Sequence, residues 1–215
     1  MTFDIQHINE NKIEVLKIIE NFFKISPAQI SALENYVENL LAENQLYNFI
    51  GKSTINDIWH RHILDSIQLV KYLNNFTDKF ADFGSGAGFP GFVLSIAGVQ
   101  EIHLIEKAFR KADFLRKVKN ISPNKIFVQQ KKLEEIEGYK FDCIVSRALA
   151  PLDKLLNYCN SFLNENGYCL FLKGKNLGQE IALAKQNFNF EFELFPSLTS
   201  AESNIIKINK LSIIK

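Results

Sequence analysis

The feature that most constrains the fold is a glycine-rich segment in the middle of the chain. Four glycines fall within the run Ala81-Asp-Phe-Gly84-Ser-Gly86-Ala-Gly88-Phe-Pro-Gly91, which follows one short apolar stretch and leads into another. Glycines let a backbone turn sharply and come close to a ligand. The segment therefore predicts a strand, a tight turn and a helix, with a ligand bound at the turn.

Around this segment the chain alternates short apolar runs with stretches of helical periodicity, starting at Lys79. Such alternation predicts an α/β fold with a mostly parallel sheet. The final two apolar runs are separated by a break around Pro196, which indicates a C-terminal antiparallel strand pair. The expected strands are 80–83, 102–105, 126–129, 141–145 and 168–172, then the pair 191–195 and 204–209, and the expected helices are about 90–97, 107–119, 152–163 and 177–187.

The first 75 residues have helical rather than strand-like periodicity. Two helices are expected over the apolar positions in 13–23 and 30–41, and Ser26-Pro27 is a favourable start for the second. A third helix is expected over about 53–70. The predicted regions are an N-terminal helical extension over 1–75, packed on the body, and an α/β domain over 76–215.

Composition narrows the class of protein. A hydrophobic content of 47% is enough for a substantial core, and 25 basic against 24 acidic residues give a net charge of +1. A polyanion partner would therefore need a local basic patch. No stretch reaches the ~18 apolar residues of a membrane span, and no signal-peptide pattern is found, so we expect a cytoplasmic monomer without a membrane partner.

The three cysteines argue against two kinds of small-protein scaffold. Cys143, Cys159 and Cys169 are odd in number and lack Cys-x-x-Cys spacing. This pattern disfavours a disulfide framework and a zinc knuckle, and it favours a reducing compartment. His60 and His62 are two apart, a spacing that does not bind zinc on a helix, so we expect no metal.

By itself the glycine loop allows two cofactors. Gly86-Ala-Gly88-Phe-Pro-Gly91 has the spacing of a dinucleotide fingerprint, and Glu106 follows where an acid would bind a ribose. Asp82 ahead of Gly84 instead favours S-adenosylmethionine (SAM), because a carboxylate would attract its cationic methionine end and repel a pyrophosphate. The expected C-terminal strand pair, found in many SAM-dependent methyltransferases, favours SAM as well. A tight turn without a ligand is the third alternative.

A second candidate site residue follows the expected fourth strand. Arg147 lies in Ser146-Arg147-Ala148, and strand ends beside a switch in strand order are where ligands bind in open α/β sheets. Arg147 either faces that cleft or pairs with a neighbouring carboxylate on the surface. The sequence leaves both alternatives open.

Several segments, taken in order and spacing, resemble one known family. They are Arg61-His-Ile-Leu-Asp-Ser66, the run from Asp82 to Gly91, Leu133-Glu134, Ser146-Arg147-Ala148 and Leu172-Lys-Gly174. Together they resemble ribosomal RNA small-subunit methyltransferase G, also called glucose-inhibited division protein B. The resemblance implies a Rossmann-like SAM-dependent methyltransferase fold and transfer of a methyl group from SAM to N7 of a guanine in 16S rRNA, with the rRNA or the small ribosomal subunit as partner.

The resemblance also implies a set of cofactor contacts. Gly84 and Phe89 would belong to the SAM site in the glycine loop, Glu106 would bind the ribose, and Leu133 and Glu134 would border the adenine. Arg147 would contact SAM from the end of the fourth strand. The remaining candidates, from the loop pattern itself, are Asp82, Gly86 and Gly88.

Candidate RNA-binding residues are basic side chains in three segments. Lys107, Arg110 and Lys117 share one polar arc of the helix expected at 107–119. They form either a phosphate-binding rim or an ordinary solvated helix face. The other candidates are Arg61 and His62 on the third N-terminal helix, whose alternative role is helix packing, and Lys173 at the end of the fifth strand.

Residues that carry other methyl-transfer chemistries are missing from the expected positions. Ser146-Arg-Ala-Leu149 replaces the (Asn/Asp)-Pro-Pro-aromatic motif of exocyclic-amine methylation, and Cys143 lies mid-strand rather than exposed as a nucleophile. Guanine N7 carries a free lone pair, so alignment can do most of the catalytic work without an acid or base. Two rivals from other classes remain open: a nicotinamide-dependent oxidoreductase and a noncatalytic rRNA-binding assembly factor.

Overall fold

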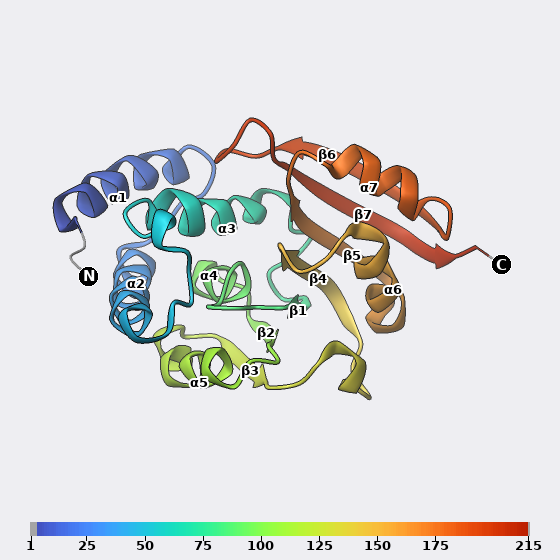
Figure 1. Cartoon of the computed structure of the whole chain (residues 1–215), viewed down its shortest axis with the longest axis horizontal. Helices are drawn as coiled ribbons and strands as arrows, with labels where there is room; N and C mark the ends of the chain where they lie inside the picture. Colours follow the sequence, from blue (N-terminus) through green and yellow to red (C-terminus); the bar gives the residue numbers. More distant parts are fainter. Residues whose placement is uncertain (1–3, 215) are drawn as a thin grey trace.

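The computed structural model describes residues 4–214 and places a seven-stranded sheet between layers of helices (Figure 1). Its order is β3-β2-β1-β4-β5-β7-β6, parallel from β3 to β5 and antiparallel where β7 pairs with β5 and β6. The predicted α/β class, the parallel sheet and the antiparallel C-terminal pair are confirmed. The strands are β1 (Lys79–Phe83), β2 (Glu101–Ile105), β3 (Lys125–Gln129), β4 (Phe141–Arg147), β5 (Leu163–Lys173), β6 (Phe188–Pro196) and β7 (Asn204–Ile213).

Four helices of the body follow strands, and most predicted boundaries agree to within a few residues. Two differ more. β5 begins at Leu163 rather than at 168, because the exposed polar run 164–166 hides its start in the sequence. β7 ends at Ile213 rather than at 209, while the last helix ends at Ala184, three residues before the predicted 187. These helices are α4 (Gly91–Ala97), α5 (Phe109–Val118), α6 (Leu152–Phe162) and α7 (Leu177–Ala184).

The first two N-terminal helices are confirmed as α1 (Ile5–Glu20) and α2 (Pro27–Tyr47). Ser26 caps α2 as its sequence predicts: the Ser26 hydroxyl accepts from the Gln29 backbone N–H, while the Gln29 side chain accepts from the Ser26 N–H. None of the described helices is both long and apolar enough to cross a membrane.

The prediction of one regular third helix over 53–70 was wrong. A short 3₁₀ turn (Lys52–Thr54) is followed by a π-helical turn (Trp59–Leu64), then by α3 (Asp65–Ile67) and a second 3₁₀ turn (Gln68–Tyr72). Most side chains between Ile58 and Val70 are buried. Because neighbours surround the segment on several sides, tertiary packing sets its winding more than the periodicity does.

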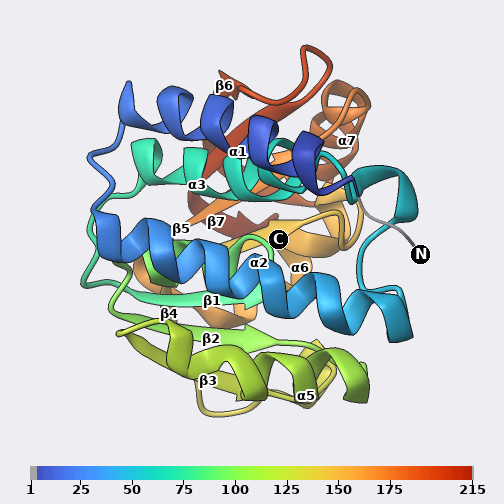
Figure 2. The same cartoon turned by 90° about the vertical axis from the view of Figure 1, so that its left-hand side faces the viewer.

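Alternate residues of the strands fill two hydrophobic layers, one on each face of the sheet. Phe80 and Ile102 pack in the layer that includes α4, α5 and the N-terminal helices. Ala81 and Phe83 pack in the opposite layer, which includes α6 and α7. Figure 2 shows α1 and α2 lying across the face that is turned toward the viewer, and α2 contacts α4 there. Buried residues from Ile8 to Val70 share this first layer with the body.

The site-forming edge of the sheet lies where the strand order reverses. β1 pairs with β2 on one side and with β4 on the other. The loops that follow β1 and β4 therefore leave the sheet side by side, at the ends where ligands bind in open α/β sheets.

Helix α2 supports the glycine loop from behind. The fully buried Tyr36 donates its hydroxyl hydrogen to the Ala87 carbonyl at 2.5 Å, and its ring stacks 4.5 Å from that of Phe92. Gln29 Nε2 donates to the carbonyls of Ile96 and Ala97 at the end of α4. The N-terminal helices thus hold both the loop and the helix that follows it.

We expect Tyr36→Phe to lower the free energy of unfolding by about 1–3 kcal/mol, because the ring still fits but the buried Ala87 carbonyl loses its donor. Urea denaturation measures the change. Tyr47→Phe on the same helix is a matched control, since Tyr47 is 39% exposed, and it should stay within about 0.5 kcal/mol of the wild type. Equal losses in both variants would contradict the supporting role of Tyr36.

Candidate active site

A cavity of about 430 Å³ opens at the carboxyl ends of β1 and β2. We call it the glycine-loop cavity. Six of the predicted cofactor residues come together in its wall, although they are spread over more than 60 positions of the sequence, from Gly84 to Arg147. They are Gly84, Gly86, Glu106, Leu133, Glu134 and Arg147.

Glu106 ties the glycine loop to the end of β2. Its Oε2 accepts from the Gly86 N–H at 2.9 Å and its Oε1 from the Ala108 N–H at 2.7 Å. Gly86 has φ +59°, and a β-carbon built there would meet nothing closer than the Gly84 carbonyl oxygen at 3.9 Å. A ligand can therefore approach the bare backbone at Gly86.

Gly88 and Gly91 serve packing rather than the cavity. A β-carbon on Gly88 would lie 2.8 Å from the Tyr36 hydroxyl, and one on Gly91 would lie 2.6 Å from Leu104 and 2.7 Å from Asp82. Within the loop, Gly88 lies on the side that faces Tyr36 of α2, away from the cavity wall.

Asp82 is fully buried beneath the loop. Its Oδ2 accepts from the Gly91 N–H at 2.9 Å, while its Oδ1 has no hydrogen-bond partner among the described residues. Burial raises the pKa of this carboxyl to about 7, against the opposing effect of the Gly91 hydrogen bond. The structure thus leaves one buried carboxylate oxygen in need of a donor.

Phe89 supports the site from below instead of lining the cavity with its ring. The side chain is 3% exposed, and its ring stacks on the His62 ring at 4.8 Å. The Arg147 guanidinium lies 5.0 Å over the centre of the same ring. Phe89 therefore provides the surface on which Arg147 and His62 rest.

A second cavity of about 580 Å³ lies on the other side of the loop after β4. The segment 147–150 borders both cavities. Its Leu149 packs closely on Gly84, since a β-carbon built on Gly84 would lie 2.6 Å from the Leu149 side chain. The second cavity lies between the N-terminal extension, the ends of β4 and β5, and the loop joining β6 to β7. The N-terminal extension contributes Thr54, Arg61, His62 and Asp65. The ends of β4 and β5 contribute Arg147 and Leu172–Gly174, and the β6–β7 loop contributes Thr199, Ser200 and Ser203.

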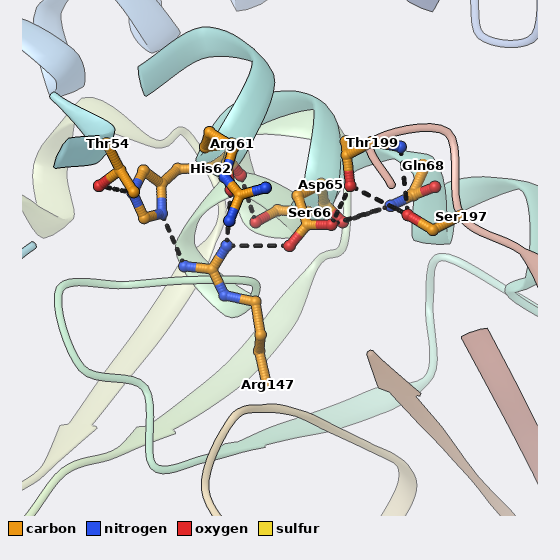
Figure 3. Close-up of polar contacts among 9 residues, drawn as sticks. All are labelled: Thr54, Arg61, His62, Asp65, Ser66, Gln68, Arg147, Ser197 and Thr199. Atoms are coloured by element: carbon orange, nitrogen blue, oxygen red, sulfur yellow. Dashed lines mark hydrogen bonds and ion pairs between the residues drawn. The ribbon is translucent and has the colours of Figure 1, made fainter. Parts of the chain in front are cut away.

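Arg147 is held at the boundary by three acceptors from the N-terminal extension (Figure 3). Its Nη1 donates to Asp65 Oδ2 at 3.0 Å and to the Arg61 carbonyl at 3.1 Å, and its Nη2 contacts His62 Nδ1 at 2.9 Å. Both sequence alternatives for Arg147 are therefore realised together: it faces the cavities and it pairs with a carboxylate.

The hydrogen-bond direction at His62 follows from its partners. An arginine only donates, so His62 Nδ1 accepts, and the ring hydrogen on Nε2 is donated to Thr54 Oγ1 at 2.9 Å. Burial, Arg147 and Arg61 together lower the pKa of His62 to about 3. The ring is neutral at physiological pH, which removes the charge that would attract an RNA phosphate.

The predicted RNA-binding residues separate in the structure. Lys107 lines the glycine-loop cavity and Arg61 the second cavity. Arg110 lies 4.4 Å over the Tyr47 ring, Lys117 pairs with Glu43 and Asp113, and the buried Lys173 pairs with Glu180 at 2.7 Å. Four further lysines line the glycine-loop cavity: Lys111, Lys131, Lys132 and Lys154.

A family model described as rRNA small subunit methyltransferase G (GidB) matches residues 29–206. The chain belongs to this family. Members similar to this chain, each named Ribosomal RNA small subunit methyltransferase G, include one from Rickettsia prowazekii, 39% identical and covering 88% of this chain and 98% of its own length. Another, from Paramagnetospirillum magneticum, is 35% identical and covers 87% and 92%.

Solved structures support the fold of this family member. A ribosomal protein L11 methylase from Lactobacillus delbrueckii superposes with a TM-score of 0.55 at 21% identity over 68% of this chain and 76% of its own. The M. jannaschii TYW2 in complex with AdoMet gives 0.51 at 14% identity over 70% and 77%. The methyltransferase fold predicted for the body is confirmed.

We expect the stability of the protein to fall as the pH rises from about 4 to 7, in part because of Asp82. Its folded pKa of about 7 lies above the ordinary 3.8, so the folded state holds a proton that the unfolded state releases. Asp82→Asn cannot ionise, and its stability relative to wild type should increase by up to about 4 kcal/mol between pH 4 and 8. Thermal unfolding across this range tests it, and a pH-independent difference would contradict it.

Proposed function

We propose that this protein transfers the methyl group of SAM to N7 of a guanine in 16S rRNA. The observation that carries the proposal is a pair of adjoining cavities in a member of this family, which share the segment 147–150 in their walls. The glycine-loop cavity would hold SAM and the second cavity the guanine. Relatives named for methylation of small-subunit rRNA, and a same-fold protein in complex with AdoMet, support it.

The residues of the glycine-loop cavity fit the parts of SAM. The Glu106 carboxylate at the end of β2 suits the ribose hydroxyls, and Leu133 with Glu134 gives an apolar and a polar edge for the adenine. Asp82 lies beneath the loop rather than in the cavity wall, and its negative charge would favour the cationic methionine end of the cofactor through the loop. The bare backbone at Gly86 leaves room for close contact.

The chemistry needs little from the protein beyond alignment. When bound, SAM would supply the methyl group: the N7 lone pair would form the new C–N bond as the C–S bond breaks, its electrons would remain on sulfur, and the sulfonium charge would pass to the guanine. The protein has to hold N7 in line and keep water out, which can supply several kcal/mol of rate acceleration. His62 is neutral and already hydrogen-bonded on both ring nitrogens, so it is not free to act as a general base. All three cysteines are buried and so do not present a nucleophile.

Lysines around the mouth of the glycine-loop cavity are suited to the RNA backbone. Lys107 comes from the loop before α5 and Lys111 from the first turn of that helix. Lys131 and Lys132 come from the loop after β3, and Lys154 comes from α6. Charge gathered there would bind phosphates even though the whole chain carries only +1. Arg61 would add a contact on the acceptor side.

Two further features belong to the proposal. The three buried, free cysteines favour action in the cytoplasm, and we propose that the protein acts there as a monomer. Family membership disfavours the nicotinamide-dependent oxidoreductase. A noncatalytic rRNA-binding role would leave the modification absent.

We expect 16S rRNA from cells that carry the gene to contain one N7-methylguanine that is lost on its deletion, as measured by nucleoside mass spectrometry. With SAM and RNA both saturating, single-turnover transfer should be nearly independent of pH from about 6.5 to 8.5, because N7 needs no deprotonation and His62 does not titrate there. Titration of Asp82 near pH 7 would change SAM affinity rather than this saturated rate. A product methylated at an exocyclic amine, or a rate that rises tenfold per pH unit, would overturn the mechanism.

We expect Gly86→Val to abolish SAM binding in calorimetry while keeping the circular dichroism of the wild type. The branched side chain would occupy the open space that the cofactor needs, at a φ of +59° that valine rarely adopts. Gly178→Val in α7, where a β-carbon meets nothing within 4 Å, is the control and should bind SAM normally. Wild-type affinity in Gly86→Val would refute the cofactor site.

A further inference from the structure

The two carboxylate oxygens of Asp65 face different parts of the molecule. Oδ2 accepts from Arg147 Nη1 at 3.0 Å, at the boundary between the two cavities. Oδ1 accepts from the Thr199 hydroxyl at 2.7 Å, in the loop that joins β6 to β7 (Figure 3). The Asp65 side chain therefore connects Arg147 with the loop that joins β6 to β7.

Thr199 lies on the acceptor side alone. It lines the second cavity and is absent from the wall of the glycine-loop cavity. Gln68 holds the same loop from α3's end: its Oε1 accepts from the Leu198 N–H at 2.8 Å, and its Nε2 donates to Ser197 Oγ at 3.2 Å and to Asp65 Oδ1. The loop thus has a defined position relative to Asp65.

Arg147 keeps part of its hydrogen-bonding capacity for a ligand. A guanidinium has five N–H bonds, and three of them are used by Asp65, His62 and the Arg61 carbonyl. The other two have no acceptor among residues 4–214. The Asp65 side chain is only 15% exposed, so its charge acts on Arg147 with little screening by water.

We propose that Asp65 is a positioning residue that fixes Arg147 against the bound cofactor and links SAM affinity to the β6–β7 loop through Thr199. Asp65 is the only charged one of the three Arg147 partners; the other two are the neutral His62 and a carbonyl. A disturbance of Thr199 would loosen Asp65 and then Arg147. Because coupling is reciprocal, a guanine that orders Thr199 strengthens SAM binding. The inference rests on the proposed function, which assigns SAM to one cavity and the guanine to the other.

The test measures the SAM dissociation constant by calorimetry without RNA. Asp65→Asn should raise it by about 10–100-fold, the loss expected for a charged hydrogen bond. Thr199→Val, which keeps the shape but cannot donate, should raise it by about 3–10-fold, and Thr199→Ser should restore it. The double variant should be no weaker than Asp65→Asn alone, because both act through one carboxylate. Glu202→Gln, exposed in the same loop, should match the wild type.

The outcomes separate this inference from simpler ones. If Thr199→Val leaves SAM affinity unchanged and only raises the KM for RNA, Thr199 contacts the acceptor directly and the link through Asp65 is wrong. Additive losses in the double variant would also overturn it. Thr199 is partly exposed, so its variants should keep the melting temperature of the wild type. An unchanged melting temperature then excludes misfolding as the cause of a change in SAM affinity. A wild-type chain that fails to bind SAM would instead refute the proposed function.

Discussion

The glycine loop after β1 has to fit between the sheet and α2 with backbone alone, and the rest of the site depends on this close packing. Leu104 and the Asp82 side chain leave no space for a β-carbon at Gly91, and Tyr36 leaves none at Gly88. The inner glycines therefore let α4 begin directly beside β1. The outer side of the loop, at Gly84 and Gly86, is free to form the cavity wall.

The second cavity is completed by a part of the chain that lies outside the α/β body. Asp65 and His62 come from an irregular, largely buried segment, and they give Arg147 a charged and a neutral acceptor. Burial of the ion pair would be costly without these additional hydrogen bonds. The irregular winding between Trp59 and Tyr72 brings Arg61, His62 and Asp65 to one guanidinium.

The sequence predicts the body well because its strands and helices carry strong periodic patterns. It also predicts the cavity wall, since glycine spacing locates Gly86 and the end of the next strand locates Glu106. It fails where contacts join residues far apart in the chain. One partner of Lys117 is Glu43, 74 positions earlier, so this candidate RNA-binding residue also forms an ion pair between helices that the sequence pattern does not indicate.

Other features of the site have the same origin. The ring of Phe89 faces inward because His62 and Tyr36 cover it, and neither contact follows from the motif in which Phe89 lies. The roles of Asp65 and Thr199 need the fold as well, because 134 positions separate the two residues. The sequence motif from Arg61 to Ser66 contains Asp65, but the motif does not indicate which residues Asp65 contacts.

The origin of the three acceptors for Arg147 has a consequence for how such proteins evolve. An isolated body starting near residue 76 would keep the arginine and lose all three acceptors, leaving its guanidinium over the Phe89 ring with no counter-charge from Asp65. The helical extension is therefore not an accessory that can be exchanged between enzymes like a separate module. Its sequence from Arg61 to Asp65 and the arginine that ends β4 have to be inherited together.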